Sequence, residues 1–351
     1  MDAEKYDISA HYIIRKHDFY ELIGNIFSIN SKLNPFHKYA NMMTFYASYL
    51  IFKELRLLKK SGYKPDIIIL EWTQILLLID KIKEIYPHAI YISSEHDVSL
   101  LGYKRKLEIE HNKFIHLYRK IQYKNLYKRE ISALNQCSKI IPHNDKDLEL
   151  LVKCGVNNEK LCSIIPYYTN YSSIIRKPNN KDIIYFGAMS RKENYLSAIW
   201  FIENVMPLLK NYNIRFIVIG GSPDKSLDKY KSDKIIITGY VNDLFEYFSS
   251  CFCMVAPLVL GAGIKVKVLE AMAAGVPVLT NDIGIEGIPA INGKHYLNCN
   301  TPIEYANNII KYYEKASELN AIGINGKRNV LSKFNKESSL YNYIKLLGSL
   351  R

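Results

Sequence analysis

Residues 261–288, GAGIKVKVLEAMAAGVPVLTNDIGIEGI, place two glycines and two lysines just ahead of a predicted helix. The turn follows an apolar segment, 251–258, that is predicted to be a strand. The first amides of a helix lack intrahelical partners and carry partial positive charge, which suits an anion. Gly261 and Gly263 let a ligand approach the backbone closely, and Lys265 and Lys267 add two full charges. The stretch therefore predicts a site that holds a diphosphate without a metal.

Glu270 lies one to two turns into the same predicted helix. Its two carboxylate oxygens can accept hydrogen bonds from the vicinal hydroxyls of a ribose. Together with the lysines it predicts a nucleoside-diphosphate site, whereas the alternative is a solvated helix start with an ordinary packed alanine face. The pattern GxxxxGK[ST] is absent, and the fragment from Gly261 to Val266 lacks the third glycine of a dinucleotide fingerprint.

Helices and strands are predicted to alternate along the chain, which indicates an α/β protein with parallel sheets covered on both faces. The first half predicts a long helix over about 36–60 and a helix over 144–155, with Asn144 as its cap and Gly155 as its stop. Predicted strands of the first half lie at 65–72, 89–95, 138–142 and 161–166. Those of the second half lie at 183–189, 215–221, 234–241, 251–258 and 275–280.

The length of 351 residues predicts two domains. We expect an acceptor-side domain over 1–166, a linker over 167–182, a donor-binding domain over 183–334, and a terminal helix over 335–351 that crosses back to the first domain. Two such domains would face a cleft, where a ligand belongs. The first domain is expected to be incomplete, because only a weak strand, 7–14, stands where an opening strand, Gly-rich turn and helix are usual.

Positive charge is concentrated in one segment. The chain has a formal net charge of +13, and residues 104–129 hold nine Lys or Arg against two Glu, interleaved with aromatic residues. Such a face can lie on an anionic membrane surface or attract a phosphorylated partner, and a solvated helix with inward aromatics explains it equally well. No nucleic-acid motif accompanies it, so nucleic acid is not an expected partner.

The chain is expected to be cytoplasmic, and peripheral at the inner face of the membrane if the basic segment meets lipid. No stretch is long and apolar enough for a transmembrane helix, and the N-terminus carries no secretion signal. The six cysteines are scattered and are expected to be free thiols. No Asp-x-Asp pair is identified at a predicted strand end, so neither a metal nor another cofactor is expected.

The stretch 261–288 resembles the donor-binding signature of GT-B glycosyltransferases of family 4, the glycosyl transferases group 1. The resemblance extends over 183–340, including 183–209, 215–221 and 239–251, and more loosely over 93–106. It implies two Rossmann-like, doubly wound parallel-sheet domains, with a nucleotide sugar in the second, an acceptor in the first, and retention at the anomeric carbon.

The resemblance also implies roles for individual residues. Glu270 would bind the ribose, and Lys265 and Lys267 the diphosphate. His96 and Asp97 would act catalytically, facing the sugar from across the cleft. The remaining donor-binding residues would be Gly187 for the phosphate, Gly239, Tyr240 and Val241 for the base, and Gly261, Ala262, Gly263 and Ile264 for the sugar, held by backbone amides.

Two positions depart from the family pattern. Ala262 stands where the family often has a second glutamate that contacts the sugar, which leaves the sugar's identity open. Arg191 and Lys192 are offset from the basic pair usually found after the first strand of this domain. The phosphate charge is therefore expected to fall mainly to Lys265 and Lys267.

The predicted function is hexosyl transfer from a nucleoside-diphosphate sugar to a saccharide or lipid-linked acceptor, in surface polysaccharide synthesis. The alternatives are a degenerate nucleotide-binding or scaffold protein, an NAD-dependent oxidoreductase, and a GT-B sugar-nucleotide epimerase.

Overall fold

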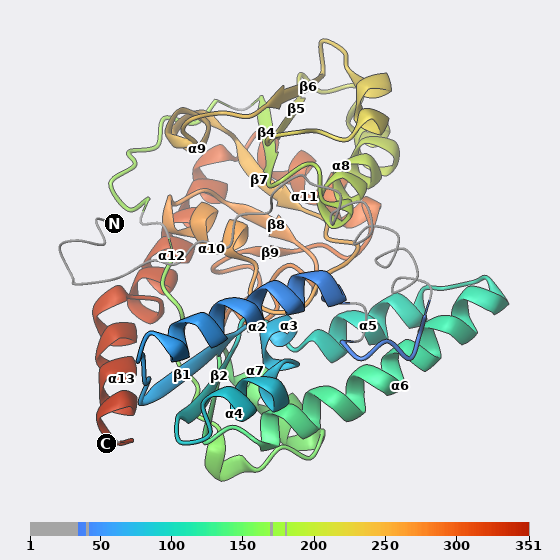
Figure 1. Ribbon diagram of the computed structural model, residues 1–351. Coiled ribbons are helices and arrows are strands. Elements are labelled where there is room, and N and C mark those ends of the chain that lie inside the picture. The colour runs from blue at the N-terminus through green and yellow to red at the C-terminus, as the bar shows by residue number, and fades with distance from the viewer. Residues whose placement is uncertain (1–33, 40–41, 169–170, 180, 351) are drawn as a thin grey trace. The chain divides into compact units, whose positions relative to one another are not determined.

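The computed structural model describes residues 34–39, 42–168, 171–179 and 181–350 (Figure 1). They form two compact units. The first holds the described residues up to 141 together with 150–162, and the second holds 142–149 and the described residues from 163 onward. The domain limits expected from the sequence stay predictions. The weak opening strand expected at 7–14 lies outside the described residues, as does the question of whether an opening unit is missing.

The first unit is built on a three-stranded sheet in the order β1-β2-β3. β1 and β2 are parallel, with Ile67 opposite Ile90. Buried Leu, Ile and Tyr side chains from the sheet and its helices form one core. The elements up to η2 are α2 (Phe45–Lys60), β1 (Ile67–Glu71), α3 (Thr73–Leu76), α4 (Ile79–Ile85), β2 (Ile90–Glu95), α5 (Ser99–Glu108), α6 (Lys113–Asn135), β3 (Lys139–Pro142), α7 (Asp145–Lys153) and the 3₁₀ turn η2 (Asn158–Lys160). The end of β3 and the first half of α7 fall in the second unit, which holds 142–149.

Two predictions for this part of the chain were wrong. The first helix begins at Phe45 and not near residue 36, because Asn34 closes a turn with the amide of Phe36 and Thr44 caps α2 by accepting from the Ala47 amide. The strand expected at 161–166 reduces to a single bridge between Leu161 and Ile140. By contrast, Asn144 caps the start of α7 through the Asp147 amide, as predicted.

The second unit contains a six-stranded parallel sheet in the order β6-β5-β4-β7-β8-β9. The predicted strands are confirmed, because unbroken runs of β-branched and aromatic residues are buried on both faces. The elements are β4 (Asp182–Phe186), α8 (Lys192–Asn204), η3 (Met206–Leu209), β5 (Arg215–Ile219), η4 (Lys225–Tyr230), β6 (Ile235–Gly239), α9 (Phe245–Ser250), β7 (Cys253–Ala256), α10 (Val266–Ala273), β8 (Val278–Thr280), β9 (Leu297–Asn298), α11 (Pro302–Tyr313), α12 (Ala316–Lys333) and α13 (Lys336–Gly348).

Helices pack closely on this sheet. α8 and α11 lie side by side (Figure 1), and Trp200 meets Tyr305 edge to face with ring centroids 5.9 Å apart. α12 packs against the end of α10 through small residues, because a Cβ on Gly323 would lie 2.4 Å from the Gly275 carbonyl oxygen. Glycine at position 323 therefore sets the distance between the two helices.

All six cysteines are free thiols, as expected, and most are buried. In the part of the chain that the structure describes, the helices are each too short or too polar to span a bilayer.

We predict that Gly323→Ala lowers the free energy of unfolding by about 2 kcal/mol, because the new methyl group collides with backbone that cannot move aside. Gly348→Ala is the matched control, since it is also helical and its Cβ would meet nothing within 4 Å. That change should leave stability unaltered or raise it by up to about 1 kcal/mol. Urea unfolding followed by circular dichroism measures both. Equal stability of the two variants would contradict close packing of α12 on α10.

Candidate functional site

The second sheet has a topological switch point between β4 and β7. From β4 the chain moves outward through β5 and β6, and it then returns to β7 and moves the other way through β8 and β9. Loops that leave neighbouring strands in opposite directions open a crevice at the carboxyl ends of those strands, where α/β proteins bind ligands. The loops after β4 and β7 carry residues 187–191 and 257–265, which include most of the predicted donor-binding residues.

Glycines bring the backbone together at this edge. The Gly187 amide donates to the Ile219 carbonyl, and a Cβ on Gly220 would lie 1.8 Å from the Gly187 oxygen. A Cβ on Gly187 would lie 2.9 Å from Lys267 Nζ and 3.0 Å from Asn194 Nδ2. The end of β4 thus forms the floor under the Lys267 ammonium, and only glycine fits there without moving these groups.

Lys267 is partly buried and brings a desolvated ammonium beside this floor. Its Nζ donates to Asn194 Oδ1 at 2.5 Å and to Tyr185 Oη at 3.3 Å, and it lies 4.9 Å from the centre of the Tyr185 ring. Burial lowers the pKa of Lys267 to about 7, against the opposing effect of Glu193, and Arg191 and Lys265 lower it further. An arriving anion would restore the charged form, so the site is suited to a ligand with at least one negative charge.

Lys265 is held by the loop that it follows. Its Nζ donates to the Gly263 carbonyl and lies 3.7 Å from Glu286 Oε2. Glu286, whose side chain is 1 % exposed, also forms an ion pair with Lys146. Lys265 and Lys146 therefore both face the buried carboxylate of Glu286.

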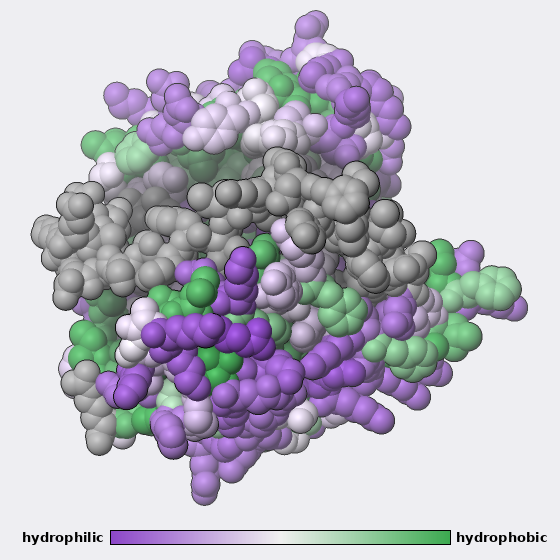
Figure 2. Space-filling model, viewed as in Figure 1, coloured by the Kyte–Doolittle hydropathy of each residue, from purple (hydrophilic) through white to green (hydrophobic). Residues whose placement is uncertain are grey.

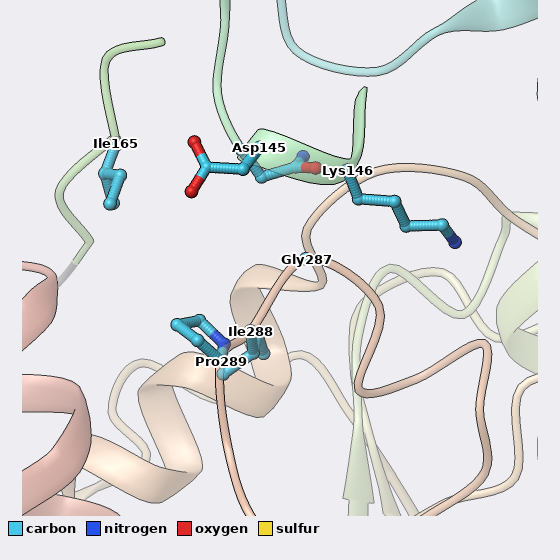
Figure 3. Close-up of a pocket in the computed structure, with 7 residues that line it drawn as sticks. Asp145, Lys146, Ile165, Gly287, Ile288 and Pro289 are labelled. Atoms are coloured by element: carbon cyan, nitrogen blue, oxygen red, sulfur yellow. The ribbon is translucent and has the colours of Figure 1, made fainter. Parts of the chain in front are cut away.

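The loop that carries Glu286 packs tightly against Ile264 and Asn144. A Cβ on Gly287, whose φ is +75°, would meet Ile264 Cγ1 at 2.8 Å and Asn144 Cγ at 3.1 Å. The loop after β8 is thus fitted between the 261–265 turn and the residue that caps α7. A pocket of about 250 Å³ lies beside this loop (Figure 3), lined by Asn144, Asp145, Lys146, Ile165, Gly287, Ile288 and Pro289. This pocket contains none of the predicted donor-binding residues.

Glu270 lies in the middle of α10 and is partly buried. Its negative charge contributes to the raised pKa of Tyr171. Burial is the main cause of that rise, and the charges of Glu270 and Asp243 add to it. Tyr171 in turn packs edge to face on Phe245 and Phe248 of α9. The predicted ribose carboxylate is therefore close enough to Tyr171 to affect its pKa, and Tyr171 packs on the helix that follows β6.

The predicted base-binding turn and basic pair are also exposed at loops after strands of this sheet. Gly239 ends β6 with φ +73°, its carbonyl accepts from the Gly220 amide at 2.9 Å, and the Tyr240 ring beyond it is exposed. Arg191 occupies the N-cap position of α8 without a side-chain capping hydrogen bond and is paired with Glu193, while Lys192 is exposed. Val241, next in the turn, packs against the core.

His96 and Asp97 lie in the first unit, just past the end of β2. His96 Nε2 is 2.7 Å from Glu71 Oε2, and its ring stacks on Trp72 with centroids 4.2 Å apart. Asp97 accepts from Ser99 Oγ at 3.3 Å. The side chains at the ends of β1 and β2 thus form one polar cluster around the predicted catalytic pair.

A buried carboxyl lies beneath this cluster. Glu95 accepts from Thr73 Oγ1 at 3.1 Å and from Ser93, and burial raises its pKa to about 7 although both hydroxyls oppose the shift. Burial likewise raises the pKa of Glu130 on α6, and the nearby charge of Glu95 adds to that rise.

Sequence reasoning missed several of these groups. Glu286 stands in the same quoted stretch as the lysines, but nothing local marks it as an ion-pair partner. Tyr185 and Asn194 reach Lys267 only through the fold. Lys146 lies in the helix predicted over 144–155, and nothing in that segment indicates an ion pair with Glu286.

The expectation that no Asp-x-Asp pair lies at a strand end was too broad. Asp145 and Asp147 do form an Asp-x-Asp pair shortly after β3, although Asp147 accepts from Asn144 Nδ2 at 2.7 Å at the start of α7. In the described ranges, His, Cys, Asp and Glu side chains nowhere gather in a group of three or more that could hold a metal ion.

Part of the second unit is similar in sequence to a known protein family. Residues 180–315 match the family model of the glycosyl transferases group 1. An uncharacterized 44.6 kDa protein in the cps region of Klebsiella pneumoniae is 25% identical over 159 residues, which cover 42% of this chain and 41% of that protein. The match thus spans less than half of that relative.

Solved structures share the fold over most of the chain. Sucrose-phosphate synthase from Thermosynechococcus elongatus has a TM-score of 0.69 and 16% identity, covering 87% of this chain and 78% of its own. Anabaena HepE in complex with UDP and glucose gives 0.64 and 14%, covering 86% and 81%. TarM gives 0.66 and 17%, covering 86% of this chain and 58% of its own.

These neighbours have the GT-B fold, and the two parallel sheets described above are those of its two Rossmann-like domains. The resemblance found in the sequence is confirmed over residues 180–315, which contain the switch-point loops around Lys265 and Lys267 and match the model of the glycosyl transferases group 1.

Proposed function

We propose that this protein transfers a hexose from a nucleoside-diphosphate sugar to a saccharide or lipid-linked acceptor, with retention and without a metal. The observation that carries the proposal is the pair of lysines at the switch point of a group 1 glycosyltransferase domain, one buried and one held by a loop. Solved neighbours lend support, because HepE is described with UDP-glucose and S. aureus TarM with UDP and alpha-GlcNAc-glycerol. The relative in a cps region supports a setting in polysaccharide synthesis.

The donor would lie with its diphosphate against Lys265, Lys267 and the first amides of α10. Gly187 would admit a phosphate next to the end of β4, and Glu270 would accept from the ribose hydroxyls. The turn at Gly239, Tyr240 and Val241 would meet the base. The sugar would be held by backbone amides of 261–264, because Ala262 offers no polar side chain.

Bond breaking would proceed through an oxocarbenium-like transition state in which negative charge grows on the leaving diphosphate. Lys265, Lys267 and the helix amides would then stabilise the transition state more than the ground state. The acceptor hydroxyl would attack from the face that the diphosphate leaves, and the leaving phosphate would take the proton. His96 and Asp97 would serve the acceptor side, with Glu71 holding the imidazole of His96.

We further propose a cytoplasmic enzyme that meets an anionic membrane surface through the basic segment 104–129. Lipid-linked acceptors would then be presented at the surface on which the enzyme lies. The charge of that segment supports this proposal.

A second candidate is a nucleotide-binding or scaffold protein without turnover. Ala262 favours it, because the glutamate that often contacts the sugar is replaced. Nucleotide binding by calorimetry, with neither transfer to any acceptor nor hydrolysis of the donor, would distinguish this candidate from the enzyme.

Lys265→Ala and Lys267→Ala are each expected to lower kcat/KM by about 30- to 1000-fold, which corresponds to about 2–4 kcal/mol of lost transition-state stabilisation. The assay follows release of the nucleoside diphosphate, in EDTA, with the nucleotide sugar that protects the wild type best from heat. Lys294→Ala, an exposed lysine outside the site, is the control and should retain full activity. Unchanged turnover in both site variants would contradict the diphosphate assignment, and loss of wild-type activity in EDTA would contradict metal independence.

Glu270→Ala, which removes both acceptor oxygens, should remove the preference for ribose. The wild type is expected to bind a ribonucleoside diphosphate about 10- to 100-fold more tightly than its 2′-deoxy analogue, because a hydroxyl bonded to a carboxylate contributes about 1.5–3 kcal/mol. In the variant the two ligands should bind with nearly equal affinity. Calorimetric titration with both ligands measures the difference, and an undiminished preference in the variant would place the ribose elsewhere.

Donor affinity should fall as the pH rises above about 7. Lys267 has a pKa of about 7 in the free protein, and a bound diphosphate should raise that pKa. Below pH 7 the ammonium is charged in both states, so affinity is flat. Above pH 7 binding takes up one proton, and affinity should decline by up to tenfold per pH unit.

Calorimetry of nucleotide-sugar binding in two buffers of different ionisation enthalpy measures this proton uptake directly. The diphosphate of a nucleotide sugar does not itself titrate in this range. Lys267→Met should bind more weakly at pH 6 and show no proton uptake at pH 8. An equal uptake in wild type and variant would assign the titration to another group.

A further inference from the structure

The end of the hairpin formed by α5 and α6 is apolar and exposed. Four side chains, here called the apolar tip, lie at the end of α5 and in the first turns of α6: Ile109, Phe114, Ile115 and Leu117. Phe114 is 87 % exposed, Leu117 58 % and Ile109 53 %. α5 and α6 lie side by side in Figure 1, and hydrophobic side chains gather at the end of this hairpin in Figure 2.

The tip is a well-defined piece of structure. Asn112 caps α6 by accepting from the Phe114 amide at 3.0 Å and the Ile115 amide at 3.2 Å. Arg119 on α6 pairs with Glu110 in the connection at 2.9 Å and donates to the Lys106 carbonyl at the end of α5. These contacts fix the backbone of the turn, so the exposure of the apolar side chains is a consequence of the fold around them.

Positive charge surrounds the tip. Lys104, Lys106, Lys113 and Lys120 are exposed on the two helices. Both acidic residues of the segment are engaged, since Lys104 lies 3.8 Å from Glu108 and Arg119 pairs with Glu110. Apolar side chains at the end of a basic element are the combination that binds the interface of an anionic bilayer.

We propose that the apolar tip inserts into an anionic lipid surface, with the lysines around it contacting the head groups. The proposal rests on the proposed function for its membrane setting, and it names the element that enters the lipid. The combination of positive charge and apolar side chains favours a lipid surface over a second copy of this chain or a nucleic acid. A second copy of this chain would bring lysines against lysines, and a nucleic acid would leave Phe114 and Leu117 in water.

The test uses the full chain with sedimented vesicles of phosphatidylcholine alone, or with about one third phosphatidylglycerol. The wild type should bind the anionic vesicles and not the neutral ones. Phe114→Ser combined with Leu117→Ser should weaken binding at least tenfold while the dependence on salt remains. Lys113→Gln combined with Lys120→Gln should weaken binding at low salt and flatten the salt dependence. Ile303→Ser, at a position 63 % exposed on α11, is the matched control and should bind as the wild type does.

Insertion itself is read from Phe114→Trp, whose emission should shift to the blue on anionic vesicles and be quenched by brominated lipid. The proposal is overturned if the wild type does not bind anionic vesicles, if the Phe114 and Leu117 changes leave binding intact, or if the tryptophan stays in water. It is equally overturned if sedimentation shows that the tip holds two copies together.

This outcome is separable from the proposed function. The Phe114 and Leu117 variant should retain wild-type turnover with a soluble acceptor and no vesicles. Lys265→Ala should lose turnover yet bind vesicles normally. A failure of the vesicle-binding results would therefore leave the proposed transferase activity untouched, and a failure of the turnover results would leave lipid insertion untouched.

Discussion

The candidate site of the second unit is organised around one desolvated ammonium group, that of Lys267. Lys267 is taken out of water at the switch point, and burial brings its pKa down to about 7. Desolvating a cation is unfavourable unless polar groups surround it. Asn194 and Tyr185 accept hydrogen bonds from Lys267 Nζ and so replace part of its lost hydration. Glycine at position 187 leaves the room in which the ammonium lies. The remaining deficit of negative charge is the physical basis for expecting an anionic ligand there.

Much of the fold could be predicted because the signals are local. Runs such as residues 183–186 are apolar without interruption, which is typical of strands buried on both faces, and the alternation with helices implies a parallel sheet. Errors arose where apolar residues serve another purpose. The aromatic residues before Phe45 resemble the start of a helix, yet Asn34 and Thr44 direct the backbone into a turn and a cap. After β3, residues 162–166 are apolar and extended but pair with little of the sheet.

The candidate site divides in the same way. The turn, the two lysines and Glu270 lie within ten residues, so their spacing alone indicated a diphosphate and a ribose. The partners of those lysines could not be predicted, because Asn194 is 73 residues from Lys267 and Lys146 is 140 residues from Glu286. Such pairs are set by which loops leave the same edge of the sheet, and a single sequence does not contain that information at any one place.

Glu286 gives the 261–265 turn a negative partner from within the chain, because its buried carboxylate attracts both Lys265 and Lys146. If the proposed donor binds at this turn, the carboxylate would compete with the phosphates for Lys265. Release of the spent nucleotide would then be assisted by an internal anion that takes back its cation.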